Sequence, residues 1–133
     1  MEGEELLIRQ PLQLGSDGSL VCAAEVPEGQ EIRLMIGTKE SLLKATRQAA
    51  EDALRGLSGR KVRMVFVFES ASRRKLLGRD AYQELEILHS LFGEGVPLAG
   101  CYDFGETFPL QDERHLGQTY FLNKAIVLLA LGE

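Results

Sequence analysis

The sequence KVRMVFVFES, residues 61–70, contains the strongest strand signal of the chain. It is rich in β-branched and aromatic residues, and from Val65 to Phe68 every residue is apolar, so both faces of an extended chain would be apolar. Such a run is typical of a strand in the middle of an α/β sheet, covered on both sides. We therefore predict a central strand over residues 61–68 that is buried on two sides.

Upstream of this strand the sequence predicts three strands and a helix. Residues 6–14 and 19–26 are apolar-rich and are separated by Gly-Ser-Asp-Gly, which favours a hairpin turn. Residues 31–37 alternate between apolar and polar side chains, as a third strand does. Apolar residues then recur at spacings of three and four between Thr38, a candidate N-cap, and Gly59. An antiparallel meander followed by an amphipathic helix is expected.

Downstream, the pattern predicts a second helix and two more strands. Asp80 and Gln83 resemble a capping box ahead of an apolar helical face. Residues 96–104 read as a strand, residues 109–118 as a polar loop and residues 119–132 as one long closing strand. The expected fold is α/β: a mixed sheet with an antiparallel meander, a βαβ crossover, a final antiparallel strand and two main helices.

Size and charge narrow the range of functions. A chain of 133 residues fits one domain, residues 1–133, and its 15 basic and 20 acidic residues give a net charge of −5. No basic run suits nucleic acid, and residues 125–132, the longest apolar run, fall short of the roughly 20 that a membrane span needs. Cys22 and Cys101 are in no metal-binding spacing. We expect a reduced, cytoplasmic chain with neither metal nor cofactor.

A candidate ligand site lies where two of the predicted strands end. In a βαβ unit the carboxyl ends of both parallel strands reach the same edge of the sheet, where ligands tend to bind. The side chains expected there can hold a carboxylate in an arginine fork, hold an ammonium against acids and cover an apolar group with rings, as a small zwitterion requires. They are Arg73, Arg74, Tyr102, Asp103, Gly105 and Glu106.

Each of these residues also has a purely structural interpretation. The arginines, with Lys75 and Arg79, also fit a solvated basic loop. Glu106 can pair with a surface lysine, and Gly105 can simply permit a turn. Tyr102 and Phe104 fit core packing as well as ligand contact. The sequence leaves these alternatives open.

Catalytic chemistry has little support in the sequence. Cys101 is a conceivable nucleophile with His89 or His115 as its base, which would make the chain a small α/β enzyme for an amino-acid-like substrate. Neither histidine belongs to a catalytic motif, and a lone cysteine in a strand is usually a small buried hydrophobe. Two isolated histidines are also a weak signal for haem. We therefore expect a binding domain and no enzyme.

Four segments together resemble the C-terminal half of the FIST sensory domain. They are residues 26–37, 65–88, 96–106 and 120–132. The likeness as a whole spans nearly the entire chain, from Arg9 to Leu131. The resemblance implies an intracellular domain of bacterial signal transduction that binds small molecules such as amino acids. It also implies two partners, an N-terminal FIST half and an output domain such as a histidine kinase. Some relatives are linked to haem and nitric oxide.

The resemblance also assigns individual residues. The family's Gly-Glu pair falls on Gly105 and Glu106, and its arginine falls on Arg73 or Arg74. Where relatives often carry a cysteine after the central strand, this chain has Glu69. The N-terminal half of the unit is not recognisable, so a third hypothesis is a structural half-domain that packs on a partner, and a homo-oligomer stays open.

Overall fold

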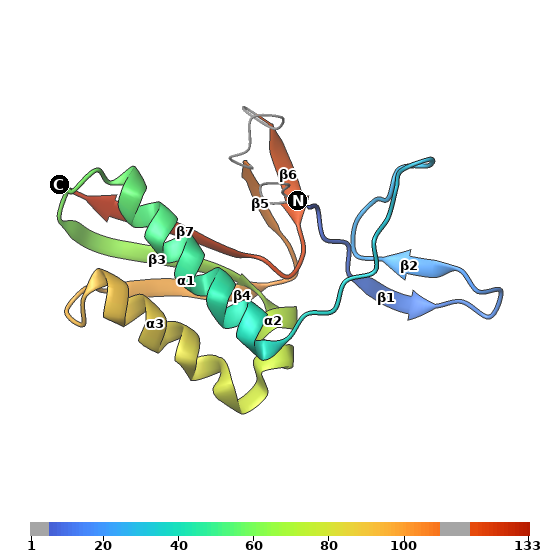
Figure 1. The fold of residues 1–133 in the computed structure, drawn as a ribbon, viewed down its shortest axis with the longest axis horizontal. Coiled ribbons are helices and arrows are strands. Elements are labelled where there is room, and N and C mark those ends of the chain that lie inside the picture. The colour runs from blue at the N-terminus through green and yellow to red at the C-terminus, as the bar shows by residue number, and fades with distance from the viewer. Residues whose placement is uncertain (1–5, 110–117) are drawn as a thin grey trace.

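The computed structural model describes residues 6–109 and 118–133. The elements are β1 (Pro11–Leu14), β2 (Leu20–Cys22), α1 (Lys39–Gly56), β3 (Val62–Ser70), α2 (Ala71–Leu77), a 3₁₀ turn η1 (Gly78–Ala81), α3 (Tyr82–Phe92), β4 (Leu98–Asp103), β5 (Glu106–Pro109), β6 (Thr119–Leu122) and β7 (Ile126–Gly132). The main sheet has the order β4-β3-β7, while β1-β2 and β5-β6 form separate two-stranded sheets (Figure 1).

Strand β3 is the centre of the main sheet, as its apolar sequence predicts. It runs parallel to β4 and antiparallel to β7. The chain passes through α2, η1 and α3 between β3 and β4, which is the crossover that parallel neighbours require. The predicted mixed α/β fold is confirmed, and so are its two long helices, α1 and α3.

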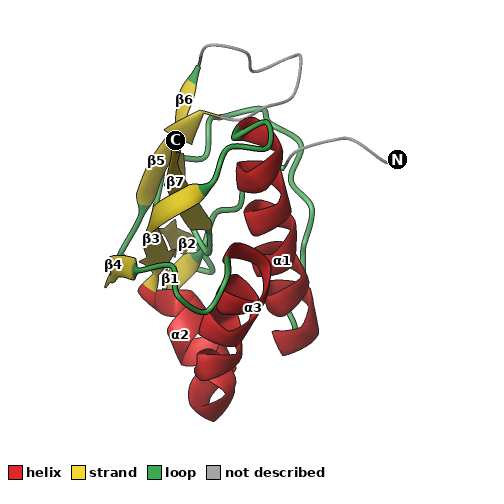
Figure 2. Ribbon diagram, turned by 90° about the vertical axis from the view of Figure 1, so that its left-hand side faces the viewer, coloured by secondary structure: helices red, strands yellow, loops and turns green. Residues whose placement is uncertain are grey.

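Both long helices pack on one face of the main sheet. Ala50 of α1 and Leu88 and Phe92 of α3 form a buried cluster with Val65 and Val67 of β3. Figure 2 shows the helices together on one side of the strands. Helix α1 begins at the predicted N-cap, where the Thr38 hydroxyl accepts a hydrogen bond from the Ser41 amide in a capping box.

The other face of the main sheet carries no helix among the described residues, which corrects the expectation of burial on two sides. Phe68 of β3 is 38% exposed, and Leu129 and Leu131 of β7 are 52% and 45% exposed. Strand β3 has apolar residues on both faces, but helices cover only the face with Val65 and Val67. We call the other one the helix-free face.

The predicted third strand of the meander is wrong. Residues 31–37 form no strand, and Leu34 and Ile36 are 99% and 87% exposed. Only the hairpin of β1 and β2 forms. An alternating pattern fits a half-buried strand, but the strand also needs a neighbour for its backbone groups, and no described strand lies beside this segment.

The alternative of a solvated basic loop after β3 holds only in part: Arg74, Lys75 and Arg79 are exposed, but Arg73 is buried and the segment is helical. Residues Ala71–Leu77 form helix α2, which continues through η1 directly into α3. Because α3 is entered from another helical turn, Asp80 caps nothing, and the predicted capping box with Gln83 is absent. The Asp80 carboxylate instead accepts a hydrogen bond from the Lys39 ammonium at 2.5 Å.

The predicted closing strand is interrupted. It divides into β6 and β7 at residues 123–125, where Lys124 has a left-handed backbone with φ of 55°. Buried Asn123 accepts a hydrogen bond at its Oδ1 from the Gln10 amide at 3.3 Å, which ties the N-terminal segment to this break. Pro109 belongs to strand β5, which the sequence did not predict, and residues 110–117 of the expected loop lie outside the described residues.

A candidate ligand pocket

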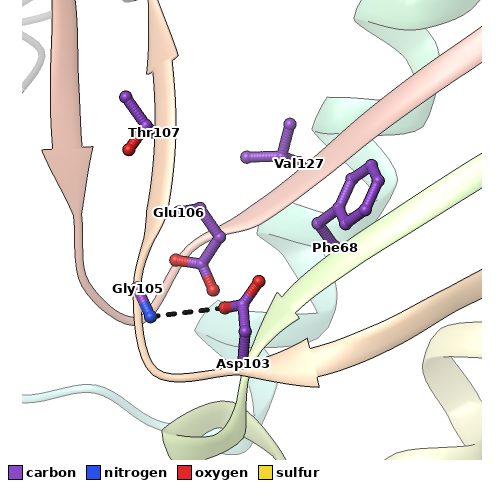
Figure 3. A pocket seen from close by; sticks show the side chains of 6 residues that line it. All are labelled: Phe68, Asp103, Gly105, Glu106, Thr107 and Val127. Atoms are coloured by element: carbon purple, nitrogen blue, oxygen red, sulfur yellow. Dashed lines mark hydrogen bonds between the residues drawn. The ribbon is translucent and has the colours of Figure 1, made fainter.

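A pocket of about 270 Å³ lies at the end of the main sheet, on its helix-free face (Figure 3). Strands β3 and β7 supply an apolar wall, and the turn from β4 into β5 supplies two carboxylates that lie side by side. The lining residues are Phe68, Asp103, Gly105, Glu106, Thr107 and Val127.

The turn between β4 and β5 depends on a glycine. The Gly105 amide donates a hydrogen bond to Asp103 Oδ1 at 3.3 Å, which fixes the Asp103 carboxylate at the pocket. A Cβ at position 105 would lie 1.9 Å from Cζ of Phe121, whose strand β6 pairs with β5. Only a residue without a side chain lets this ring approach so closely.

Ser70, the last residue of β3, orients the inner carboxylate. Its hydroxyl lies 2.7 Å from both Oε1 and Oε2 of Glu106, and it accepts a hydrogen bond from the Ala125 amide at 3.0 Å. The hydroxyl has one proton, so it donates to one Glu106 oxygen at a time. Glu106 is 4% exposed, and most of its surface is therefore enclosed by protein.

The surroundings of Glu106 in the pocket affect its charge. Burial, followed by the neighbouring Asp103 carboxyl, raises the pKa of Glu106 to about 7, although the Ser70 hydrogen bond lowers it. Near neutral pH Glu106 is therefore present both with and without its proton. A cation placed between Asp103 and Glu106 would favour the ionised form.

Asp103, Gly105 and Glu106 come together in the pocket, while Tyr102 and Phe104 do not line it. Tyr102 is opposite Glu69 in the β3–β4 register and therefore lies on the helix-covered side, with its pKa raised by burial and then by the charges of Glu69 and Glu84. Phe104 is 92% exposed. Phe104 is not part of the strand predicted over residues 96–104, because β4 ends at Asp103.

The structure does not bring Arg73 or Arg74 to the pocket. Arg73 is 1% exposed, and its guanidinium donates to Glu84 Oε1 at 2.5 Å and to the Thr46 hydroxyl at 2.8 Å. Arg74 is exposed and donates to the Gly78 carbonyl. The expected pair of Arg73 and Glu106 around one zwitterion is therefore not assembled. The cause is helix α2, which turns Arg73 towards α1 and α3 and away from the helix-free face.

Cys101 and His89 do not form a catalytic pair either. Exposed Cys101 is opposite Phe68 in the β3–β4 register, on the helix-free face, whereas His89 belongs to α3 on the other side of the sheet. His115 lies outside the described residues. No cluster of three or more His, Cys, Asp or Glu side chains in the described ranges has the arrangement of a metal site.

Sequence reasoning missed Phe68, Ser70, Thr107 and Val127. Phe68 and Ser70 could have been predicted from the sequence, since they lie at the end of the central strand beside the expected site. Val127 had none, because it joins the pocket only through the register in which it pairs with Phe68.

The fold is a small α/β domain with a pocket at one end of its main sheet. A family model described as the FIST C domain matches residues 1–109, well over half of the chain, and the chain therefore belongs to the FIST C domain family. This family is associated with sensing and signal transduction. No curated protein and no solved structure matches the chain. In the described part, no helix is both long enough and apolar enough to cross a membrane.

Proposed function

We propose that this chain is an intracellular sensing domain of bacterial signal transduction, whose pocket binds the ammonium group of an amino acid or a similar small amine. Its family membership supports the sensory role. The observation that carries the ligand class is the pair of carboxylates, Asp103 and Glu106, side by side in a pocket whose described lining residues include no basic side chain. We propose binding without turnover.

The lining of the pocket matches the two parts of such a ligand. An ammonium group between two carboxylates makes charge-assisted hydrogen bonds, which are about twice as strong as neutral ones. Phe68 and Val127 offer an apolar wall to the carbon atoms next to the amine. With Arg73 enclosed elsewhere, no described lining residue is a cationic partner for the ligand's own carboxylate, so we propose that the pocket recognises the amine end.

Ser70 offers a route from the pocket to the helices. It holds Glu106 through its hydroxyl and is also the N-cap residue of α2. A ligand cation that binds Glu106 competes with this hydroxyl for the same oxygens. Ligand binding would thereby change the position of Ser70, and with it the start of α2.

The proposed partners are an N-terminal FIST half and an output domain such as a histidine kinase. A specific observation favours a second, structural role, packing on such a partner: Phe68, Leu129 and Leu131 leave the helix-free face apolar and exposed. Contiguous exposed apolar surface commonly marks an interaction site. Both roles can belong to one domain, since the pocket occupies only the end of this face.

A thermal-shift screen tests the ligand class. The probes are the twenty standard amino acids, methylamine and, as an anionic control, acetate. The proteins are the wild type, Glu106→Gln and the matched control Glu94→Gln, which changes an exposed carboxylate outside the pocket. A probe at 100 times its Kd stabilises the folded state by about 2.7 kcal/mol.

We expect at least one amine-containing probe to raise the Tm of the wild type and of Glu94→Gln, and to raise that of Glu106→Gln much less. Acetate should have no effect. The proposal is wrong if no amine raises the Tm of the wild type, or if the same amine stabilises Glu106→Gln equally.

A further inference from the structure

A second group of ionisable side chains is buried on the helix-covered face, apart from the pocket. Glu69 of β3, Arg73 of α2 and Glu84 of α3 are 5%, 1% and 2% exposed. The Arg73 guanidinium lies 2.5 Å from Glu84 Oε1 through Nη2 and 3.4 Å from Glu69 Oε1 through Nε. One cation thus joins carboxylates from two different elements, and we call these three residues the buried triad.

The charges of the buried triad do not balance when both carboxyl groups are ionised. One guanidinium faces two carboxylates, which leaves a net charge of −1 in a place that water hardly reaches. An uncompensated charge in such a place costs several kcal/mol. A buried acid avoids this cost by keeping its proton.

Several buried polar atoms of the triad also lack a hydrogen-bond partner. Glu84 Oε1 already accepts from Arg73 and from the Thr46 hydroxyl at 2.8 Å, whereas Glu84 Oε2, Glu69 Oε1 and Arg73 Nε have no hydrogen-bond partner. Both carboxyl groups lie against the same guanidinium, Glu84 Oε1 at 2.5 Å from Nη2 and Glu69 Oε1 at 3.4 Å from Nε. If one of the two carboxyl groups kept its proton, its O–H could donate a hydrogen bond to an unpartnered oxygen of the other.

We propose that Glu69 and Glu84 share one proton at neutral pH, and that this proton holds α3 and α2 against the end of β3 as a pH-responsive lock. With the proton, the buried triad is neutral and each carboxyl group has a partner. Without it, two carboxylates repel each other and compete for Arg73. Loss of the proton therefore loosens the contact between the helices and the sheet.

The surroundings of Glu69 favour the protonated form. Glu84 of α3 and Arg73 of α2 face it, and Tyr102 of β4 lies beside it with Arg74 nearby. The neutral groups around Arg73 are the Thr46 hydroxyl and the carbonyl oxygens of Leu42 and Lys124. Burial first, and then Glu84, raises the pKa of Glu69 to about 8, against the lowering effect of Arg73.

The sign of the pH effect follows from this raised pKa. Between pH 4.5, the ordinary value for a glutamate, and pH 8, the folded chain binds a proton that the unfolded chain releases. The contribution of Glu69 to stability is therefore complete below pH 4.5 and is lost as the pH rises through 8. Glu106 behaves in the same way only up to about pH 7, so the interval from pH 7 to pH 8 reports mainly on Glu69.

Carbon-detected NMR of the side-chain carboxyl groups tests the shared proton in the wild type. Through-bond assignment of Glu69 needs no variant. We expect its titration to have a midpoint near pH 8, and to move down by more than one pH unit in Glu84→Gln, where the repelling carboxylate is gone. A Glu69 midpoint below pH 6 in the wild type would overturn the proposal.

Chemical denaturation at pH 7 and pH 8 tests the lock. For the wild type, Glu69 makes the unfolding equilibrium constant rise about fivefold over this interval. The rise should shrink to about twofold in Glu69→Gln, the part that Glu106 supplies, and stay about fivefold in Glu106→Gln, the matched control with a carboxylate removed from the other face. An equal rise in Glu69→Gln and the wild type contradicts the proposal. Hydrogen exchange should show faster opening of α2 in the wild type at pH 8, after correction for intrinsic rates.

Discussion

Glu69 and Ser70 are neighbours in the chain, yet their side chains serve opposite faces of the main sheet. Glu69 belongs to the buried triad, and Ser70 binds Glu106 in the pocket. Successive residues of a strand point to opposite faces, so the end of β3 naturally separates the two groups. If a pocket ligand displaced this short segment, the contacts of Ser70 on one face and of Glu69 on the other would both change.

At the residue scale, Arg73 should be far more important for stability than the adjacent Arg74. Arg73→Met leaves Glu69 and Glu84 buried without their cation, and breaking a buried pair in this way costs about 3 to 5 kcal/mol. Arg74→Met changes an exposed side chain and should stay within about 0.5 kcal/mol. Urea denaturation of both variants at pH 7 measures the difference, and equal stabilities would refute the role given to Arg73.

The affinity for an amine should depend on pH through Glu106. A cation binds best to the ionised carboxylate, so below the Glu106 pKa of about 7 a proton must leave on binding. The Kd should rise by up to tenfold for each pH unit below 7 and level off above it. Titration calorimetry at pH 5.5, 6.5 and 8 with the best-stabilising amine measures this. A Kd that does not change with pH would show that Glu106 does not hold the amine.

Gly105 should tolerate no side chain while Phe121 is in place. The added methyl group of Gly105→Ala meets the ring at 1.9 Å, and such overpacking typically costs about 1 to 3 kcal/mol. The double variant Gly105→Ala with Phe121→Ala removes the clash. We expect it to recover most of this loss relative to Phe121→Ala alone, as a double-mutant cycle can measure. Equal losses in both backgrounds would mean that the ring does not restrict this turn.

At the element scale, the two predicted helix starts should respond differently to mutation. Thr38→Ala removes an observed cap and should cost about 1 kcal/mol of unfolding free energy. Asp80→Ala removes only an exposed pairing with Lys39, worth less than about 1 kcal/mol. Thermal unfolding of the two variants ranks them. A larger loss for Asp80→Ala would support the capping box that the sequence suggested.

How far the sequence predicts these elements depends on what each one needs. Strand β3 was predictable because apolar residues on both faces suit a central position. The burial of Arg73 in helix α2 was not predictable, because Arg73 and Arg74 are adjacent and identical in type. What distinguishes Arg73 is its contact with Glu84, which lies eleven residues further along the chain. Residues 31–37 alternate like a strand, but a strand also needs a neighbour, which local pattern does not reveal.

The candidate site was predictable in the same uneven way. Asp103, Gly105 and Glu106 were found because the end of a strand in a βαβ unit is a common place for ligands. Arg73 was misplaced because the expected loop is a helix, in which each residue turns by about 100° from the last. Val127 reaches the pocket through the pairing of β7 with β3, a long-range register that no local signal encodes.

At the scale of the whole molecule, the two faces of the main sheet should differ sharply in what they tolerate. Leu128 packs against the core on the helix-covered side, whereas its neighbour Leu129 is 52% exposed on the other face. Leu128→Lys buries a charge and should cost about 3 kcal/mol or more, while Leu129→Lys should stay within about 0.5 kcal/mol. Denaturant unfolding of each variant decides this, and similar losses would indicate that both faces are covered.

A map of where an amine binds tests whether the pocket is the ligand site. Backbone amide NMR spectra of the described residues are recorded while the best-stabilising amino acid is added to the wild type and to Glu106→Gln. We expect the largest shifts at Phe68, Ser70, Asp103, Gly105 and Glu106, with smaller ones at the start of α2, and we expect Glu106→Gln to lose them. Shifts confined to residues away from the pocket, or equal shifts in both proteins, would contradict it.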